Sequence, residues 1–362
     1  MALKAIDFFA GIGGVTHGFL NAGIDVIAGI DIDETCKKTY ETNNIRTNGC
    51  SSKFLCEDIT KIDIKKIQQQ ITSKDSLVLI GCAPCQPFTK ITKKLDGRIN
   101  ERGLLRSFAE VISKLKPEYL FLENVQGLNS PKNKEILIEF LDSLKPHYNL
   151  VPKIVNALNY GVPQSRRRII MFGKRDSFIE FPKPTHGFDG GKKEPLTLYK
   201  AIGSLPEIKA GEKHSKMKTH SCAKLNPINL KRLTFQKAPG DVMDKWPEEL
   251  QLKSRKIKEY KGHKDVYARL WWDKPSVTLT TKFVSVSNGR FAHPKQNRGL
   301  SILEGLLIQS FPKNYKLLSP FLRTQSKQIG NAVPVKLAEA FAKKILADFT
   351  ESKSALIKPY LP

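Results

Sequence analysis

The stretch LKAIDFFAGIGGVTHGF (residues 3–19) decides the fold class, because an apolar run leads straight into a glycine-rich loop. Gly11, Gly13 and Gly14 let the backbone turn tightly and let a ligand approach it closely. A buried strand that ends in such a loop is typical of nucleotide-binding α/β folds. A purely structural turn is the alternative, so the interpretation depends on the segments that follow.

Apolar runs alternate with amphipathic segments throughout the first half of the chain. The expected strands are LKAIDFF (3–9), DVIAGID (25–31), FLCED (54–58), SLVLIG (76–81) and EYLFLEN (118–124), and the expected helices are 33–44, 102–115 and 131–145. Such alternation predicts an α/β fold with a doubly wound, mostly parallel, Rossmann-like sheet that has helices on both faces. Ligands of such sheets bind at the carboxyl ends of the strands.

The pattern changes after RRRIIMFGKR (166–175). Residues 182–240 are rich in Pro, Gly and Lys and show no regular rhythm of helices and strands. An amphipathic segment returns at 334–349, and we expect it to pack back on the first domain. The predicted parts are a first domain of residues 1–185 completed by 315–350, a smaller basic second domain of 186–290, and a hinge region of 291–314.

The formal net charge of +25 predicts a polyanionic partner, since so many like charges repel one another unless a polyanion neutralises them. Residues 1–50 are slightly acidic, whereas residues 251–300 hold twelve lysines and arginines against three acidic residues. A uniform compositional bias toward lysine would not spare one end of the chain. We therefore predict a surface that binds nucleic-acid phosphates.

The six cysteines do not form a disulfide scaffold in a chain of 362 residues, so a reducing compartment is expected. No apolar run is long enough to span a bilayer. Asp7 interrupts the apolar start of the chain, which argues against a secretory signal. We expect a cytoplasmic protein without membrane contacts.

A nucleoside pocket is predicted at the ends of the first three strands. A dinucleotide fingerprint would place a third glycine where this chain has Thr16. Asp31 ends the second strand, where a carboxylate can accept hydrogen bonds from both hydroxyls of a ribose. Asp58 ends the next strand and could accept one from an adenine amino group. The lack of a strong pyrophosphate site favours S-adenosylmethionine over NAD as the cofactor.

A candidate nucleophile follows the fourth strand, in CAPCQPFT (82–89). A cysteine in a proline-fixed turn just past a strand end is held in one orientation and is accessible, which favours Cys85. The alternatives are a buried structural thiol, a dithiol redox site with Cys82, and half of a zinc site. The sequence lacks a second pair of zinc ligands, so no metal is expected. A redox motif should open a helix, whereas 86–103 is polar and contains glycine.

Polar side chains also follow the next strands. Glu123 and Asn124 end the fifth strand, where a carboxylate after an apolar run is expected to be partly buried and suited to proton donation. Gln164, Arg166 and Arg168 alternate along the chain, so they are expected on one face, where they could hold a base edge or a phosphate. A solvated strand end and surface basic residues are the alternatives.

Taken in this order, the segments resemble the DNA cytosine-5 methyltransferase family, in particular its compact restriction–modification members. The resemblance covers nearly the whole chain, and the ordered set is far more specific than any single motif. The matching motifs are DFFAGIGG (7–14), Asp31 with Tyr40, EDI (57–59), APCQPFT (83–89), RGLL (102–105), ENV (123–125), QSRRR (164–168), RGLS with Glu304 and QSFP (298–312), and QIGNAVP (328–334).

The resemblance implies methyl transfer from S-adenosylmethionine to carbon 5 of a flipped-out cytosine, with S-adenosylhomocysteine as the product. Cys85 would attack carbon 6, Glu123 would protonate ring nitrogen 3, and Arg166 would bind the oxygen at carbon 2. The other residues of the base pocket would be Pro84, Gln86, Asn124 and Arg168. The cofactor site would be lined by Phe8, Ala10, Gly11, Gly13, Gly14, Asp31, Ile32, Asp58, Ile59, Leu105, Asn331 and Val333.

The resemblance also implies a monomer that acts on double-stranded DNA, together with a cognate restriction endonuclease that acts on the same site without direct contact. Residues 268–283 and 289–294 resemble the end of the family's target-recognition region, whose base contacts and recognition sequence cannot be read from the chain. An RNA cytosine methyltransferase of the same superfamily and an inactive DNA-binding regulator are the alternatives. The length of the second domain argues against the first, and the intact Cys85, Glu123 and Arg166 argue against the second.

The chain departs from the common family pattern at Ala83, Asp31, Asn100, Leu303 and Leu307. These residues stand where proline, glutamate, aspartate and two arginines are frequent. The departures bear on loop and hinge contacts more than on the chemistry.

Overall fold

The computed structural model describes residues 2–72, 75–83, 101–187, 190–241, 243, 246–252 and 265–357, with the backbone alone at 101–102 and 355–357. Among these residues, no helix has the length and apolar character needed to cross a membrane.

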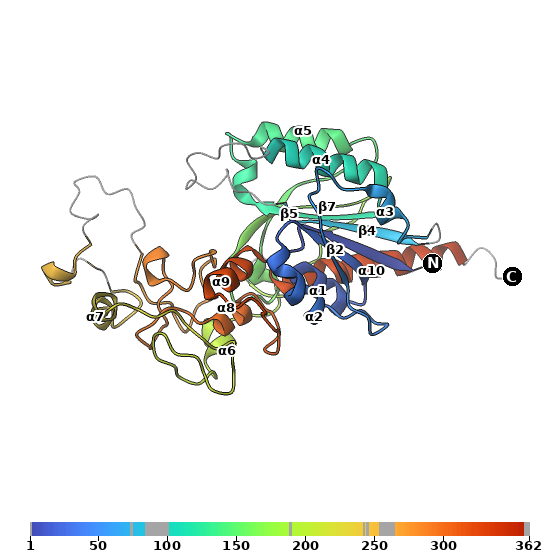
Figure 1. The fold of residues 1–362 in the computed structure, drawn as a ribbon. Coiled ribbons are helices and arrows are strands. Elements are labelled where there is room, and N and C mark those ends of the chain that lie inside the picture. The colour runs from blue at the N-terminus through green and yellow to red at the C-terminus, as the bar shows by residue number, and fades with distance from the viewer. Residues whose placement is uncertain are drawn as a thin grey trace.

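A seven-stranded sheet forms the centre of the larger lobe (Figure 1). The strands are β1 (Leu3–Phe8), β2 (Asp25–Asp31), β3 (Lys53–Cys56), β4 (Ser76–Gly81), β5 (Tyr119–Val125), β6 (Lys153–Asn156) and β7 (Arg167–Lys174). Their order is β3-β2-β1-β4-β5-β7-β6. β1 to β5 are parallel, and β7 runs antiparallel to both of its neighbours. The doubly wound, mostly parallel sheet that the sequence predicts is confirmed.

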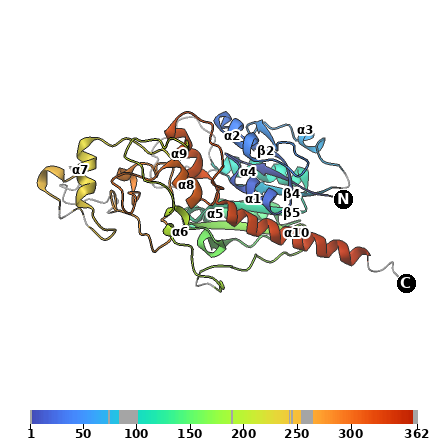
Figure 2. The same ribbon diagram turned by 90° about the horizontal axis from the view of Figure 1, so that it is seen from below.

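Helices cover both faces of the sheet (Figures 1 and 2). One face packs against α3 (Ile64–Gln68), α4 (Glu101–Leu115) and α5 (Lys134–Leu144), and the other packs against α1 (Gly14–Asn21) and α10 (Val335–Ile357). α2 (Lys37–Asn43) packs beside β3. The buried apolar side chains of α4 and α10 recur every three to four residues, which gives each helix one apolar face for the sheet.

Several expected boundaries differ from the structure, and two of them bear on the site. The first strand ends at Phe8 and the third at Cys56, so Phe9 and Asp58 lie in the loops that follow. The sequence interpretation also missed β6 and α3. β6 is a four-residue edge strand with two exposed side chains, so it carries no clear apolar pattern.

The segment between β7 and the C-terminal helices forms a second lobe with little regular structure (Figure 1). It contains α6 (Leu198–Ile202) and α7 (Pro227–Phe235), and is followed by α8 (Ile302–Ile308) and α9 (Leu322–Asn331). Short 3-10 turns occur at Glu34–Cys36, Gln126–Asn129, Ala157–Tyr160, Glu248–Leu250 and Val286–Asn288. A small core around Leu233, Trp246 and Tyr267 belongs to this lobe alone. The domain boundaries at 185/186 and 290/291 stay predictions.

Close packing of α1 against the C-terminal segment requires glycine. A Cβ atom on Gly14 would lie 2.4 Å from the carbonyl oxygen of Val333, and one on Gly18 would lie 2.6 Å from that of Val335. Both neighbours are backbone atoms, which cannot move aside without shifting the start of α10. The glycine-rich loop therefore serves packing as well as turning.

We expect Gly14→Ala to destabilise the protein by about 1–3 kcal/mol, the usual cost of forcing an extra carbon into a packed interior. Thermal unfolding of the two proteins measures the effect. Gly240→Ala is the matched control, because a Cβ at Gly240 meets no atom within 4 Å. Equal unfolding midpoints for Gly14→Ala and the wild type would contradict the packing described.

Candidate active site

The glycine-rich loop after β1 is held in place by Asp31. The backbone N–H of Gly11 donates to Oδ2 of Asp31 (2.8 Å), and that of Asp33 donates to Oδ1 (2.9 Å). Gly11 and Gly13 have φ angles of 52° and 85°, which glycine adopts at little cost. A Cβ on Gly11 would meet no atom within 4 Å. The loop thus leaves space for a ligand beside Gly11.

The structure places Phe8, expected at the cofactor site, inside the core. Its side chain is fully buried, with its ring 5.6 Å from that of Phe108. The next residue, Phe9, is only partly buried and has φ 61°. A positive φ is costly for a bulky residue, and such outliers concentrate at functional sites. Phe9 is therefore the aromatic residue that the loop can present to a cofactor. The sequence analysis missed it because it placed Phe9 inside the first strand.

The other expected cofactor residues lie at or near the carboxyl ends of β1 to β3, at or just after the end of α9 and, for Leu105, in α4. Ile32 follows Asp31 and is 71% exposed. Asp58 is partly buried, and its Oδ1 accepts hydrogen bonds from the backbone and the hydroxyl of Thr60 (3.0 and 2.9 Å). Asn331 is exposed at the end of α9. The remaining expected residues, Ala10, Ile59, Leu105 and Val333, are buried.

Two side chains of α9 connect this helix to the loop after β2. Nζ of Lys327 lies 2.9 Å from Oδ2 of Asp33, and Nε2 of Gln328 donates to the backbone oxygen of Thr35 (3.2 Å). These contacts bring the end of α9, with Asn331, close to Asp31. The sequence interpretation missed Lys327, and an exposed lysine in a strongly basic chain gives no signal of its partner.

Of two carboxyl groups near the loop, that of Asp7 is buried and that of Asp31 is partly buried. Asp7 accepts hydrogen bonds from the backbone N–H of Thr16 (3.2 Å) and from its hydroxyl (2.6 Å), and so caps the start of α1. Burial raises the pKa of Asp7 to about 7, and the hydrogen bonds from Thr16 oppose this rise. Burial also raises the pKa of Asp31, against the hydrogen bonds from Asp33 and Gly11. A ligand that donates hydrogen bonds to Asp31 would favour its charged form.

Cys85, Pro84 and Gln86 lie outside the described residues. The chain that leads to them is fixed by its neighbours, because the N–H of Cys82 donates to the carbonyl of Phe8 (3.3 Å) and Nδ2 of Asn124 donates to that of Ala83 (3.4 Å). This segment leaves from the carboxyl end of β4, beside the end of β5.

Glu123 lies at this same edge of the sheet and is buried, as expected, with 7% of its surface exposed. Its Oε1 lies 2.9 Å from Nε of Arg168, which extends from β7. In the ladder between the two strands, Arg168 pairs with Val125, two residues from Glu123. Antiparallel pairing of β5 and β7 therefore creates the ion pair, which the sequence alone did not predict.

Arg166 is 2% exposed and forms the centre of the buried polar contacts here. Nη1 donates to the carbonyl of Leu279 (3.1 Å) and Nη2 to that of Gly330 (3.2 Å). Nε has no hydrogen-bond partner within the described part of the chain. Burial, and next the charge of Arg168, lower the pKa of Arg166, whereas Glu123 raises it. A buried donor without a partner is costly, so it suits an acceptor supplied by a substrate.

Gln164 lies beside Arg166, as the alternation of the two residues predicts. Its Oε1 accepts a hydrogen bond from the N–H of Leu279 (2.9 Å), and its Nε2 donates to Oε1 of Gln309 (2.8 Å). Gln164 is fully buried, and it supports Arg166 because both residues form hydrogen bonds with the backbone of Leu279. The edge of the sheet at β4, β5 and β7 can therefore present a buried carboxylate and a free guanidinium N–H to a small polar ring.

Comparison with known proteins gives the same family as the sequence motifs, and the match extends over nearly the whole chain. The C-5 cytosine-specific DNA methylase family matches residues 3–347. The type II methylase M.HgiDII of Herpetosiphon aurantiacus is 35% identical over 350 residues, covering 95% of each chain. The type II methyltransferase M1.HphI of Haemophilus parahaemolyticus is 32% identical over 352 residues, covering 96% of this chain and 87% of its own.

Two solved structures have the same fold. One, described as a DNA modification methyltransferase encoded within an Escherichia coli prophage, has a TM-score of 0.72 at 20% identity and covers 96% of this chain and 100% of its own. Spodoptera frugiperda DNMT2, as a mutant, has a TM-score of 0.63 at 18% identity and covers 95% and 100%. Family match, relatives and fold agree: the chain belongs to the C-5 cytosine-specific DNA methylase family and is a DNA cytosine-5 methyltransferase.

Proposed function

We propose that the protein transfers the methyl group of S-adenosylmethionine to carbon 5 of a cytosine flipped out of duplex DNA, through a covalent bond between Cys85 and carbon 6. The observation that carries this proposal is the pairing of buried Glu123 with Arg168 at the strand end that leads to Cys85, beside Nε of Arg166, which has no hydrogen-bond partner among the residues that the structure describes. The relatives that bear the names of type II methyltransferases support a role as the modification enzyme of a restriction–modification system.

The residues at the ends of β1 and β2 fit S-adenosylmethionine. The open space beside Gly11 would admit the cofactor close to the backbone, and the carboxylate of Asp31 would accept hydrogen bonds from the ribose. The exposed side chain of Ile32 would pack against the adenine ring, with Asp58 near its amino group. When bound, S-adenosylmethionine supplies an activated methyl group.

The base pocket makes an unreactive carbon nucleophilic. Carbon 5 of cytosine does not attack a methyl group unaided, but addition of the Cys85 thiolate to carbon 6 turns the ring into an enamine. In its protonated form Glu123 donates a proton to ring nitrogen 3, which offsets the charge that develops as the thiolate adds, and the carboxylate that results pairs with Arg168. Nε of Arg166 donates to the oxygen at carbon 2. Arg168 holds Glu123 in place. The side chain of Asn124 shapes the pocket together with Pro84 and Gln86. Carbon 5 would then bond to the methyl group, with S-adenosylhomocysteine as the leaving group, and loss of the proton from carbon 5 would break the bond between carbon 6 and the Cys85 sulfur.

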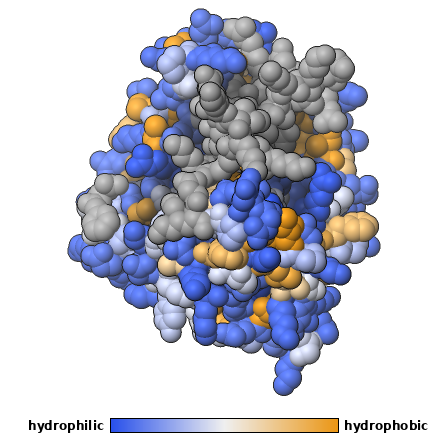
Figure 3. Space-filling model, turned by 90° about the vertical axis from the view of Figure 1, so that its left-hand side faces the viewer, coloured by the Kyte–Doolittle hydropathy of each residue, from blue (hydrophilic) through white to orange (hydrophobic). Residues whose placement is uncertain are grey.

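The second lobe positions the duplex in this proposal. A stacked cytosine cannot reach Cys85, so the base must swing out of the helix. Lysines and arginines of 186–290 contact phosphates, and a few side chains contact base edges. Apart from its grey residues, the face shown in Figure 3 is mainly hydrophilic with a few apolar patches, as we expect of such a surface. The same proposal includes a monomeric protein in the cytoplasm and a cognate endonuclease that never contacts it.

Covalent trapping tests the nucleophile. Fluorine at carbon 5 cannot leave as a proton does, so DNA containing 5-fluorocytosine and incubated with the cofactor is expected to stay bonded to Cys85, as detected by denaturing electrophoresis and peptide mass spectrometry. Cys85→Ser is expected to lose both the adduct and all methyl transfer while it still binds cofactor. Cys82→Ser, the matched control, is expected to retain both. An adduct at another residue would overturn the assignment.

Labelled cofactor presented separately with duplex DNA and with tRNA identifies the substrate. We expect label in DNA only, and bisulfite sequencing of DNA from a host that expresses the protein is expected to reveal one recognition sequence. Label in tRNA alone would instead support an RNA cytosine methyltransferase.

The cofactor assignment predicts the effect of Asp31→Ala. Loss of the carboxylate removes both the ribose contacts and the hydrogen bond that holds Gly11, so the Kd for S-adenosylmethionine is expected to rise at least about tenfold. Isothermal titration calorimetry measures it. Glu34→Ala removes an exposed acidic residue of the same loop and should leave the Kd unchanged. Equal effects of the two substitutions would point to charge alone rather than to Asp31.

A further inference from the structure

Arg269 is a buried cation of the second lobe, with 3% of its surface exposed. Among the described residues, all its hydrogen bonds go to neutral oxygens. Nε donates to the carbonyl of Gln236, Nη1 to those of His293 and Gln296 (2.8 Å each), and Nη2 to that of Leu233 (3.0 Å) and to Oδ1 of Asn297. These bonds use all five N–H groups of the guanidinium, a set that the three donors of a lysine cannot reproduce.

The acceptors of Arg269 belong to two separate segments. Leu233 and Gln236 form the C-terminal end of α7, where unpaired carbonyls and the helix dipole favour a cation. The other acceptors lie in the loop 293–297. Arg269 also forms a backbone bridge with Ala292. It therefore fixes the end of α7 to the chain that leads into the hinge region.

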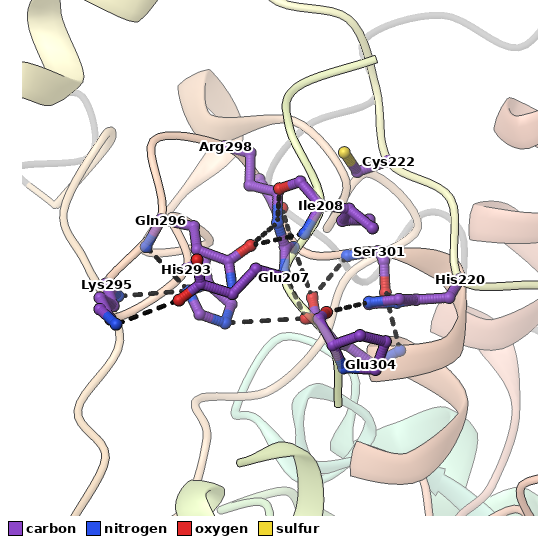
Figure 4. Close-up of polar contacts among 12 residues, drawn as sticks. Glu207, Ile208, His220, Cys222, His293, Lys295, Gln296, Arg298, Ser301 and Glu304 are labelled. Atoms are coloured by element: carbon purple, nitrogen blue, oxygen red, sulfur yellow. Dashed lines mark hydrogen bonds and ion pairs between the residues drawn. The ribbon is translucent and has the colours of Figure 1, made fainter. Parts of the chain in front are cut away.

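That loop is in turn held by the buried ion pair of Arg298 and Glu304 (Figure 4). Oε1 of Gln296 accepts a hydrogen bond from Nε of Arg298 (2.7 Å), and the two Nη atoms of Arg298 lie 2.8 and 2.7 Å from the carboxylate of Glu304. Glu304 also accepts a hydrogen bond from the N–H of Ser301 (2.7 Å), which caps the start of α8. These contacts therefore fix the position of α7 relative to α8.

The far end of α8 reaches the base pocket. Gln309 caps α8, and its side chain bonds to Gln164, which bonds to the N–H of Leu279. The carbonyl of Leu279 accepts a hydrogen bond from Arg166. Ordered, buried contacts therefore run from α7 through Arg269 to the guanidinium proposed to hold the cytosine.

α7 lies at the far end of the second lobe (Figure 1). Its exposed face is mostly apolar and carries the cation of Lys231, whose Nζ lies 3.8 Å from Oε1 of Glu249. Residues 223–240 contain four lysines and arginines and no acidic residue. The exposed positions recur at helical spacing and so share one face, which holds Pro227, Ile228, Leu230, Lys231, Thr234 and Phe235. A helix fits the major groove of DNA, where lysine contacts phosphates and apolar side chains contact thymine methyl groups.

We propose that the exposed face of α7 contacts the DNA duplex and that Arg269 is the positioning residue that holds this face in register with the base pocket. The inference rests on the proposed methylation of duplex DNA. Arg269 touches neither DNA nor cofactor, and its effect on the reaction passes through the end of α7.

Arg269→Lys and Arg269→Met test the positioning role in the full chain. With the recognition sequence known, initial methylation rates are measured on that duplex and on duplexes with one base pair changed. We expect the ratio of the two rates to fall at least tenfold for Arg269→Lys and further for Arg269→Met, with the Kd for S-adenosylmethionine within twofold of wild type. Arg175→Lys, which alters a guanidinium bonded to the Lys116 carbonyl on the first lobe, is the matched control. Lower thermal stability with an unchanged rate ratio would show that Arg269 serves folding alone.

Lys231→Ala tests the contact itself at an exposed position, where folding is not at risk. Loss of one phosphate contact is expected to weaken binding of all duplexes alike and to reduce the slope of log affinity against log salt by about one. Lys66→Ala on α3 is the matched control. An unchanged slope would overturn the contact of α7 with DNA. A wild-type protein that methylates no DNA would instead defeat the proposed function, which is a separate outcome.

Discussion

One buried guanidinium joins the three parts of this chain. Arg166 precedes β7, and its donors bind the carbonyls of Leu279, at the end of the second lobe, and Gly330, at the end of α9. The two acceptor segments also touch, because a Cβ on Gly330 would lie 2.4 Å from the carbonyl of Thr280. Burying a cation without hydrogen bonds is costly, and the two Nη atoms of Arg166 find their acceptors only when all three segments are in place.

The residues of the proposed active site come from the segments that meet at Arg166. The carboxylate of Glu123 comes from β5, its partner Arg168 comes from β7, and the free N–H of Arg166 lies between the lobes. No single segment could hold such charges out of water. Shared burial would make the proposed pocket sensitive to the position of the second lobe, and this sensitivity would couple DNA recognition to chemistry in the function proposed above.

The hinge region combines a buried ion pair with apolar packing. Breaking such a pair by removing one partner leaves an uncompensated charge and is strongly destabilising, although the intact pair adds little net stability. Arg298 and Glu304 therefore fix the geometry of α8 rather than strengthen the fold. Leu303 and Leu307, which stand where arginines are frequent in the family, pack into the apolar cluster that joins the lobes, Leu303 being fully buried.

The sequence by itself determined the fold class, four of the seven strands to within one residue, and the glycine loop with Asp31. It also identified the strand ends that carry Glu123 and lead to Cys85. These features are local, because apolar periodicity and glycine placement act within a few residues. Tertiary structure alone decided the antiparallel return of β7 that pairs Arg168 with Glu123, the carbonyl partners of Arg166 and Arg269, and the burial of Phe8 in place of Phe9. These features depend on residues far apart in the chain, and the acceptors of Arg166 and most of those of Arg269 are backbone oxygens, which leave no trace in the amino-acid sequence.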